Sequence, residues 1–212
     1  MTHAPASHQN RLTIPQLFKS ITLQEWLTAA VIAAAIGVGY WAWTQVYELT
    51  KPVLKPLGLK YLSSGLWVLA CVFLSDLIRK PGIAVFASVL AALVEGIITQ
   101  WGMQAFVYGF IQGLGAELIF ALFLYRNWSI FVLSLAAAAS ALLSYSYDYL
   151  MYEYAKLPLG LNLLQLASFM VSAVVLAAFL GRYLSLRLLK TGLIDVFLIA
   201  QAQKTKTDAP QS

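Results

Sequence analysis

The sequence predicts an all-α, polytopic membrane protein built as a bundle of six transmembrane helices. Of its 212 residues, 60% are apolar and only 11% are charged, and the mean hydropathy is +0.75. Soluble domains carry about 25% charged residues. Since a helix needs about 20 residues to cross the hydrocarbon core, six crossings use about 120 residues and leave no room for a large catalytic domain outside the membrane.

The apolar runs are expected to be helices, because backbone polar groups must be paired within lipid and no run alternates like a membrane barrel strand. The six spans are predicted at 26–47, 61–78, 83–101, 104–125, 128–151 and 161–190. The domain organisation is accordingly a cytoplasmic N-terminal tail at 1–24, a membrane domain at 25–190 and a cytoplasmic C-terminal tail at 191–212.

Proline and glycine mark where the first two helices are expected to end. Pro52 and Pro56 lie in a lysine-rich link after the first span, and proline cannot donate the backbone hydrogen bond that a helix needs. The turn Arg79-Lys80-Pro81-Gly82 follows the second span and places two cations beside two helix breakers.

The lysines and arginines predict that both termini lie in the cytoplasm. With that orientation, ten of the 14 lie on the inner side of a cell membrane, as the positive-inside rule requires. The other four are Lys51, Lys55, Lys60 and Lys156, and the first three run against the rule. Because the charges sit at helix ends and form no basic face, the expected partner is the lipid bilayer and not a nucleic acid.

Two glutamates lie inside predicted spans, where a carboxylate costs about 3 kcal/mol unless it is hidden from lipid. Glu95 shares a helical face with Ala92 and Thr99, so the third span is expected to present a small, polar stripe to a shared cavity. Glu117 lies nearer the inner side, where a hydrogen-bonded buried acid is an alternative to a functional one.

The fourth span has two distinct faces. One carries Tyr108 and Gln112, which makes Gln112 a ligand candidate. The other carries Gly109 and Gly113 with the small-xxx-small spacing that lets two helix backbones approach closely, so these glycines are expected to serve packing.

Five spans bring polar or aromatic residues to the outer rim of the membrane. An aromatic belt explains interfacial tryptophan and tyrosine without a ligand, but it does not explain an acid such as Asp148 on the same faces. Aromatic rings attract cations, and carboxylates accept hydrogen bonds from amino-substituted rings. The predicted cage therefore suits a flat, nitrogen-containing, cationic or amidine-bearing ligand, and an anionic substrate is expected to find no partner there.

The candidate ligand-binding residues combine the polar faces of the third and fourth spans with the aromatic and polar positions of the rim. They are Glu95, Gln112, Tyr108, Trp43, Tyr40, Tyr145, Asp148, Asn162 and Thr99.

The sequence lacks the residues that several kinds of functional site require. Cys71 is the single cysteine and the only histidines are His3 and His8, so no metal site or cofactor is expected. No phosphate-binding loop of the G-x-x-x-x-G-K-[ST] type occurs, so ATP-driven work would need another subunit. Catalytic residues are likewise not expected, because no nucleophile and base are paired in a recognisable motif.

The stretch from Arg79 to Glu117 resembles the YkoE family of substrate-capture (S) components of energy-coupling-factor (ECF) transporters. The resemblance rests on three segments in order and spacing: Arg79-Lys80-Pro81-Gly82, Ala91-Ala92-Leu93-Val94-Glu95 and Gln112-Gly113-Leu114-Gly115-Ala116-Glu117. It implies capture of thiamine or its hydroxymethylpyrimidine (HMP) precursor on the outer side. It also implies assembly with a transmembrane coupling subunit and two cytoplasmic ATPase subunits. Glu95 and Gln112 are where this resemblance and the face argument agree.

Two other functions stay open from the sequence. A proton-coupled secondary carrier would relay protons through Glu95 and Glu117, although the repeated halves and interrupted helices of such carriers are not evident. A non-transporting scaffold would use the polar stripes only to bind helices together. The alanines from Ala29 to Ala34 would permit docking of a partner helix, or would pack within the chain's own bundle.

Overall fold

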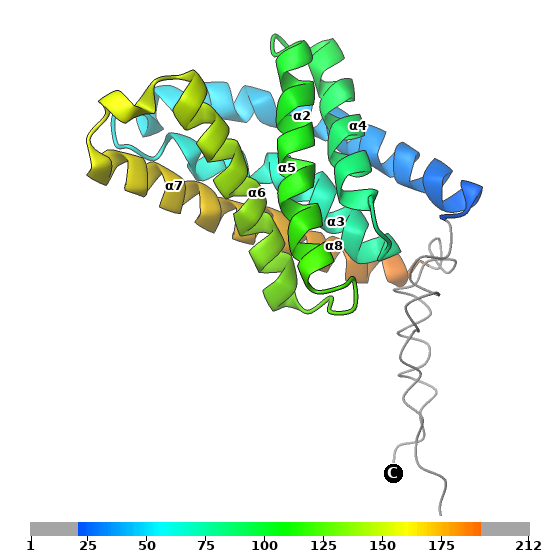
Figure 1. The fold of residues 1–212 in the computed structure, drawn as a ribbon. Helices are drawn as coiled ribbons and strands as arrows, with labels where there is room; N and C mark the ends of the chain where they lie inside the picture. The colour runs from blue at the N-terminus through cyan, green and yellow to red at the C-terminus, as the bar shows by residue number, and fades with distance from the viewer. Residues whose placement is uncertain (1–20, 192–212) are drawn as a thin grey trace, which may run out of the picture.

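The computed structural model describes residues 21–191, and every regular element in this range is a helix. In Figure 1, α4 and α5 run side by side and α2 crosses behind them, which agrees with the pairwise packing of these helices. The elements are α2 (Leu23–Leu54), η1 (Lys60–Val68), α3 (Leu69–Ile78), α4 (Ile83–Ile98), α5 (Met103–Leu122), α6 (Ile130–Met151), η2 (Tyr154–Lys156), α7 (Leu159–Ala173), η3 (Val174–Phe179) and α8 (Leu180–Leu189).

Helix α2 is longer than the predicted first span at both ends. It begins after a capping box in which the Glu25 carboxylate accepts the Thr22 N–H at 2.7 Å and the Thr22 hydroxyl accepts the Glu25 N–H at 3.3 Å. Pro52 lies inside the helix, so the expectation that it stops the first span is wrong. A proline in the last turn removes only one backbone hydrogen bond. The chain turns later, at Gly58, whose φ is +72°.

The second predicted span is present, but two kinds of helix share it. Its first half is the 3-10 helix η1, and its second half is the α-helix α3. Because a 3-10 helix rises about 2.0 Å per residue and an α-helix 1.5 Å, the 19 residues cover about 33 Å, enough for the hydrocarbon core. All ten residues of α3 are buried, so α3 is the centre of the bundle.

Helices α4 and α5 pack with their backbones in close contact. A Cβ built on Gly109 would lie 2.5 Å from the Ala92 Cβ, and one on Gly113 would lie 2.6 Å from the Val85 Cα. No side chain larger than hydrogen fits there, which confirms the prediction that these glycines serve packing. Both helices end earlier than the predicted spans, at Ile98 and Leu122.

The alanines at the start of α2 serve the chain's own bundle. Ala29 and Ala33 are fully buried, and on the same face a Cβ on Gly37 would lie 2.5 Å from the Ala91 carbonyl oxygen of α4. Docking of a partner helix on Ala29 and Ala33 is therefore excluded while α2 stays packed on α4.

The last predicted span is one continuous helical stretch from Leu159 to Leu189. It contains a π-helical segment, η3, between the two α-helices α7 and α8. Such segments widen a helix locally and occur often at functional sites.

The start of α2 and the end of α8 lie at the same end of the bundle. Lys80 Nζ lies 2.6 Å from Glu25 Oε2, which ties α2 to the link after α3. Arg182 Nη1 lies 2.8 Å from Asp76 Oδ1, which ties α8 to the end of α3. We call this the turn end of the bundle. The opposite end, which we call the cavity end, holds the links at 55–59, 99–102 and 152–158.

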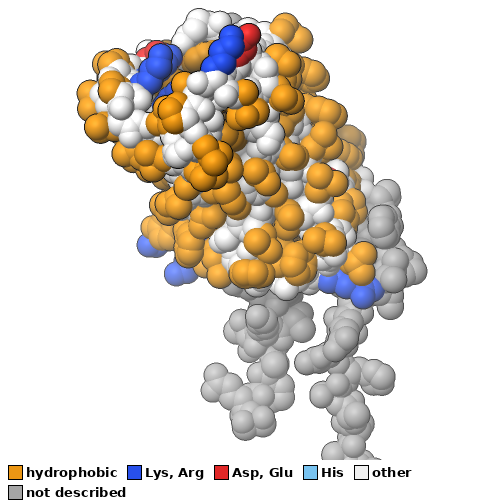
Figure 2. Space-filling view, turned by 60° about the vertical axis from the view of Figure 1, so that its left-hand side comes forward, with side chains coloured by type: hydrophobic (Ala, Val, Ile, Leu, Met, Phe, Trp, Pro, Cys, Tyr) orange, Lys and Arg blue, Asp and Glu red, His pale blue; other side chains and the backbone are white. Residues whose placement is uncertain are grey.

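The surface is that of a membrane protein. Figure 2 shows a broad band of apolar side chains with charged groups at both ends. Five helices are long and apolar enough to cross a membrane. Ile83–Ile98 is apolar but has only 16 residues, so the number of six crossings stays a prediction, as do the cytoplasmic termini. Much of each predicted tail, 1–20 and 192–212, lies outside the described residues.

Candidate functional site

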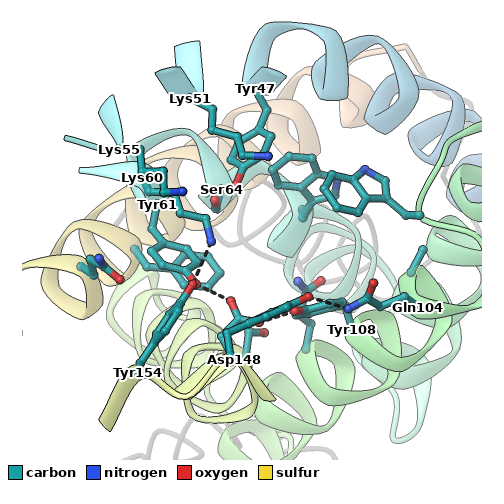
Figure 3. A pocket seen from close by; sticks show the side chains of 18 of the residues that line it. Tyr47, Lys51, Lys55, Lys60, Tyr61, Ser64, Gln104, Tyr108, Asp148 and Tyr154 are labelled. Atoms are coloured by element: carbon teal, nitrogen blue, oxygen red, sulfur yellow. Dashed lines mark hydrogen bonds between the residues drawn. The ribbon is translucent and has the colours of Figure 1, made fainter. Parts of the chain in front are cut away.

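A cavity of about 710 Å³ lies at the cavity end of the bundle. Figure 3 shows its side chains converging from several helices around a central space. Helices α2, η1, α4, α5, α6 and α7 all contribute, together with the links between them. The lining comprises Tyr40, Tyr47, Lys51, Lys55, Lys60, Tyr61, Ser64, Trp67, Ala92, Glu95, Trp101, Gln104, Ala105, Tyr108, Gly109, Gln112, Ser144, Asp148, Tyr152, Glu153, Tyr154, Lys156, Leu157, Leu161, Gln165 and Phe169.

The 3-10 helix η1 supplies one wall through residues spaced by three. Tyr61, Ser64 and Trp67 all line the cavity. Since a 3-10 helix has 3.0 residues per turn, side chains at this spacing stack on one face. The unusual helix type thus places two aromatic rings and a hydroxyl along the same wall.

Glu95 lies in the wall on α4 and is only 4% exposed. Its Oε1 accepts hydrogen bonds from Trp67 Nε1 at 2.7 Å and from Thr44 Oγ1 at 3.0 Å. The Tyr47 ring lies beside the Trp67 ring, with centroids 5.3 Å apart, and 6.5 Å from the Trp101 ring. Glu95 Oε2 has no hydrogen-bond partner in the part of the chain that the structure describes, so it can accept a donor from a ligand.

Asp148 lies on α6 at the centre of a chain of hydroxyl groups (Figure 3). Its two carboxylate oxygens accept short hydrogen bonds from the Tyr61 and Tyr108 hydroxyls. The Tyr61 hydroxyl lies 3.1 Å from that of Tyr154, which in turn accepts a hydrogen bond from Lys60 Nζ at 2.9 Å. Asp148 therefore acts on the cavity mainly through its charge and through the tyrosines that it orients.

Two amide side chains in the lining lack partners among the described residues. Gln112 makes no side-chain hydrogen bond there although it is only 6% exposed, and the buried Oε1 of Gln165 is likewise unpaired. Helices α4 and α5 run antiparallel, and a Cβ on Gly109 would contact Ala92. With this register, Gln112 lies farther from the cavity opening than Glu95 does. An unpaired buried amide is costly, and a polar ligand would satisfy it.

Four lysines lie at the opening of the cavity; we call Lys51, Lys55, Lys60 and Lys156 the mouth lysines. They are the four cations that the sequence places on the outer side. The expectation that an anionic substrate finds no partner is therefore wrong. Sequence periodicity could not show this, because Lys55 and Lys156 lie in links and Lys51 and Lys60 lie at the ends of helices, where a helical period does not decide which side chains face the opening.

Five of the nine predicted binding residues line the cavity: Glu95, Gln112, Tyr108, Tyr40 and Asp148. Of these, Tyr40 is engaged within the chain, because its hydroxyl donates to the Trp67 carbonyl at 2.9 Å and accepts from the Ala70 N–H at 2.9 Å. Tyr40 therefore offers a ligand its ring and not its hydroxyl.

The other four predicted residues, Trp43, Tyr145, Asn162 and Thr99, lie outside the lining. Trp43 Nε1 donates to the Ser63 carbonyl at 2.7 Å, and the Tyr145 hydroxyl donates to Asn162 Oδ1 at 2.8 Å. Thr99 follows the last residue of α4 and caps its end. These side chains support residues of the wall and do not face the cavity.

Several lining residues were not in the predicted set. Trp67 and Tyr61 belong to η1, whose period of three differs from the 3.6 that was assumed for a span. Trp101 and Tyr154 belong to links, where no periodicity assigns a face. Tyr47 lies near the outer end of the first predicted span, where an aromatic belt explains a tyrosine without a ligand. Gln165 lies near the start of the last predicted span, and its position alone does not distinguish a ligand contact from a contact between helices.

Glu117 lies away from the cavity and caps α4. Its Oε1 accepts the Gly82 N–H at 2.6 Å and the Tyr125 hydroxyl at 2.6 Å, and its Oε2 accepts the Ala84 N–H at 3.1 Å. Helices begin with unpaired N–H groups and a positive dipole end, which a carboxylate satisfies. The alternative of a hydrogen-bonded structural acid is therefore the correct interpretation of Glu117.

Comparisons with known proteins agree with this geometry. Residues 24–144 match the family model described as "ABC-type cobalt transport system, permease component". The chain is 31% identical over 189 residues to the Bacillus subtilis (strain 168) protein named "Putative HMP/thiamine permease protein YkoE", covering 89% of this chain and 94% of that protein. The crystal structure of an S-component of an ECF transporter matches with a TM-score of 0.83 at 30% identity, over 89% of this chain and 95% of that one. The chain belongs to the YkoE family of ECF-transporter S components.

As an S component, the chain is a substrate-binding subunit of a multi-pass membrane transporter. The resemblance seen in the segment from Arg79 to Glu117 is thereby confirmed across most of the chain. Among residues 21–191, no group of three or more His, Cys, Asp or Glu side chains is placed to hold a metal ion. The cavity of about 710 Å³ is large enough for a small organic substrate.

Proposed function

We propose that the cavity binds thiamine or its HMP precursor from the outer side of the cell membrane, with both termini in the cytoplasm. The observation that carries the proposal is the free Glu95 oxygen beside the Tyr47, Trp67 and Trp101 rings. A flat aminopyrimidine ring, which both compounds contain, stacks on such rings and donates its amino hydrogens to a carboxylate.

Gln112 complements Glu95 in this proposal. Its amide can both donate and accept, as the ring nitrogens and substituents of a pyrimidine require. The side chain lies deeper than Glu95 and has no partner among residues 21–191, so a polar ligand atom that reaches it replaces no existing hydrogen bond.

Thiamine and HMP differ in the contacts that they can make near Asp148. Thiamine carries a thiazolium ring with a permanent positive charge, which the Asp148 charge and the faces of Tyr61 and Tyr108 favour. HMP lacks that ring and gains nothing there. The proposal therefore gives thiamine the larger number of favourable contacts.

The proposed transport cycle needs partner subunits. Association with an ECF module follows from the family, and we propose that the module consists of a transmembrane coupling subunit and two cytoplasmic ATPase subunits. The sequence itself contains no G-x-x-x-x-G-K-[ST] loop to hold ATP, so the chain would bind the substrate without hydrolysing ATP.

Neither alternative function gains support from the described residues. A proton relay through Glu95 and Glu117 would need both acids along one path, but Glu117 is engaged by three donors at the turn end. A scaffold would need no cavity of about 710 Å³ lined by unpaired polar groups.

Titration of the purified chain with thiamine and with HMP tests the proposal. Of the six tryptophans, Trp67 and Trp101 line the cavity, so binding should change the intrinsic fluorescence. The change should shrink in Trp101→Phe and persist in Trp41→Phe, because Trp41 is exposed on the outside of α2. A flat titration with both compounds, in a chain that elutes as a folded species, would refute the proposal.

Glu95→Gln tests the proposed contact itself. Loss of a charge-assisted hydrogen bond should weaken thiamine binding by about 1.5–3 kcal/mol, or roughly 10- to 150-fold. The matched control is oxythiamine, an analogue with oxygen in place of the amino group. If Glu95 accepts from that amino group, Glu95→Gln should weaken oxythiamine binding far less than thiamine binding; equal losses would remove Glu95 from that contact.

A further inference from the structure

We propose that the mouth lysines form an anion-binding subsite, and that the S component prefers a phosphate monoester of its substrate over the free alcohol. This inference rests on the proposed function, because thiamine and HMP each carry the primary alcohol that such an ester would use. In this proposal the ligand's positively charged and hydrogen-bond-donating rings bind inside the cavity, and its phosphate binds to the lysines at the opening.

The charges around the opening do not cancel. Lys51 Nζ lies 3.3 Å from Glu48 Oε1, and Lys156 is paired with Glu153. Lys55 has neither an ion pair nor a side-chain hydrogen bond within residues 21–191, and its side chain is exposed at the opening. With Lys60 added, the opening carries an excess of positive charge.

Lys60 is positioned to reach a bound anion. Its ammonium lies 4.8 Å from the centre of the Tyr61 ring and donates one hydrogen bond, to the Tyr154 hydroxyl at 2.9 Å. An ammonium has three donors, so two are left for phosphate oxygens. Figure 3 shows Lys51, Lys55 and Lys60 on the same side of the cavity.

The interior has the opposite charge. Glu95 and Asp148 are buried in the lining, and both are carboxylates. A ligand with a positive or donor-rich ring at one end and an anion at the other matches both halves of this cavity. Free thiamine has only the positive end, so the mouth lysines oppose it.

The orientation of the chain in the membrane does not explain why the mouth lysines lie at this position. In the orientation favoured by the positive-inside rule, they lie on the side where lysine and arginine are depleted. All four nevertheless line the cavity opening. Their placement is explained if the opening recognises an anion. A volume of about 710 Å³ lies within the range of pockets that hold drug-sized ligands, so it can accommodate the ester.

The test compares dissociation constants of the purified full chain for thiamine and for thiamine monophosphate, measured at low and at high salt. Two charge-assisted contacts to the phosphate should make the monophosphate bind about tenfold tighter or more at low salt. The preference should fall at high salt, because the lysines at the opening are partly exposed. A neutral ester, O-acetylthiamine, separates the effect of charge from that of size and should not bind more tightly than thiamine.

The variants target the two mouth lysines without a carboxylate partner. Lys55→Gln with Lys60→Gln should abolish the preference, whereas Lys55→Arg with Lys60→Arg should keep most of it. The ratio of the two dissociation constants within one variant is the readout, since a general loss of folding cancels from it. Lys190→Gln removes the same charge at the turn end and should leave the ratio unchanged.

The outcomes of the two proposals are distinguishable. Thiamine binding with no gain for the monophosphate, or a gain that survives the double Gln variant, would overturn the anion subsite and leave the proposed function intact. Failure of thiamine, HMP and the monophosphate alike to bind would overturn both. Binding of the monophosphate alone would support the subsite and make the ester the substrate.

Discussion

Glu117→Gln is the substitution that most directly tests whether Glu117 serves folding or proton transfer. Glu117 accepts three hydrogen bonds, from the Gly82 and Ala84 N–H groups and from the Tyr125 hydroxyl, at 2.6, 3.1 and 2.6 Å. These contacts join α5 to the start of α4. We expect the variant to lose stability and to keep the ligand affinity of the fraction that remains folded.

The expected loss of stability can be worked out from the three hydrogen-bond donors that Glu117 satisfies. An amide in place of the carboxylate keeps one acceptor, so at least one of the three donors loses its partner and the others lose the help of a full charge. The free energy of unfolding should fall by about 2–3 kcal/mol. For a chain of this length, such a loss lowers the midpoint of thermal unfolding by about 4–12 °C.

The assay is thermal unfolding in detergent followed by fluorescence, with Glu48→Gln as the matched control. Glu48 makes a partly exposed ion pair with Lys51 at 3.3 Å, so its loss should cost less than about 1 kcal/mol. Equal midpoints for the two variants would refute the capping role of Glu117. A proton relay instead predicts loss of transport with an unchanged midpoint.

Two further substitutions test contacts that hold the helices of the bundle together. Lys80→Met should cost about 3–5 kcal/mol, because it leaves the buried Glu25 carboxylate without its cationic partner. Adding Glu25→Gln should restore much of the midpoint in a thermal melt. Gly65→Ala should weaken both folding and thiamine binding, because the new Cβ would lie 2.2 Å from the Ser172 carbonyl carbon. The matched control is Gly39→Ala, which should change neither property because nothing lies within 4 Å of its Cβ. Equal melting and titration curves for the two variants would contradict this prediction.

The sequence was sufficient to predict the helices and their order, because the patterns that indicate a helix or a turn are local. Apolar runs of about 20 residues and the Pro-Gly turn after Ile78 depend only on neighbours in the chain. The end of α2 could not be placed from Pro52, because the cost of a proline depends on how many turns follow it. The 3-10 conformation of η1 was also hidden, since nothing in its composition distinguishes it from an α-helix.

The candidate site was predictable only in part, for a physical reason. Glu95 and Gln112 stood out because a polar group in a span must be hidden from lipid. Trp101 and the mouth lysines gave no such signal, since aromatic and cationic residues are ordinary at a membrane interface. Their part in the cavity depends on how the links fold over the opening, which is a property of the whole bundle.

Helix η1 connects the two acids of the cavity, and its 3-10 geometry is what makes the connection possible. Tyr61 donates to Asp148, and six residues later Trp67 donates to Glu95 at 2.7 Å. At three residues per turn, six residues make two full turns, so both rings lie on one face about 12 Å apart. Wound as an α-helix, the same residues would turn through about 600°, and Trp67 would point about 120° away from the cavity wall. Gly65 holds η1 in place, because its N–H donates to Ser172 Oγ at 3.0 Å and its missing Cβ lets the α7 backbone approach. Gly65 therefore joins α7 to the helix that carries the partners of both carboxylates.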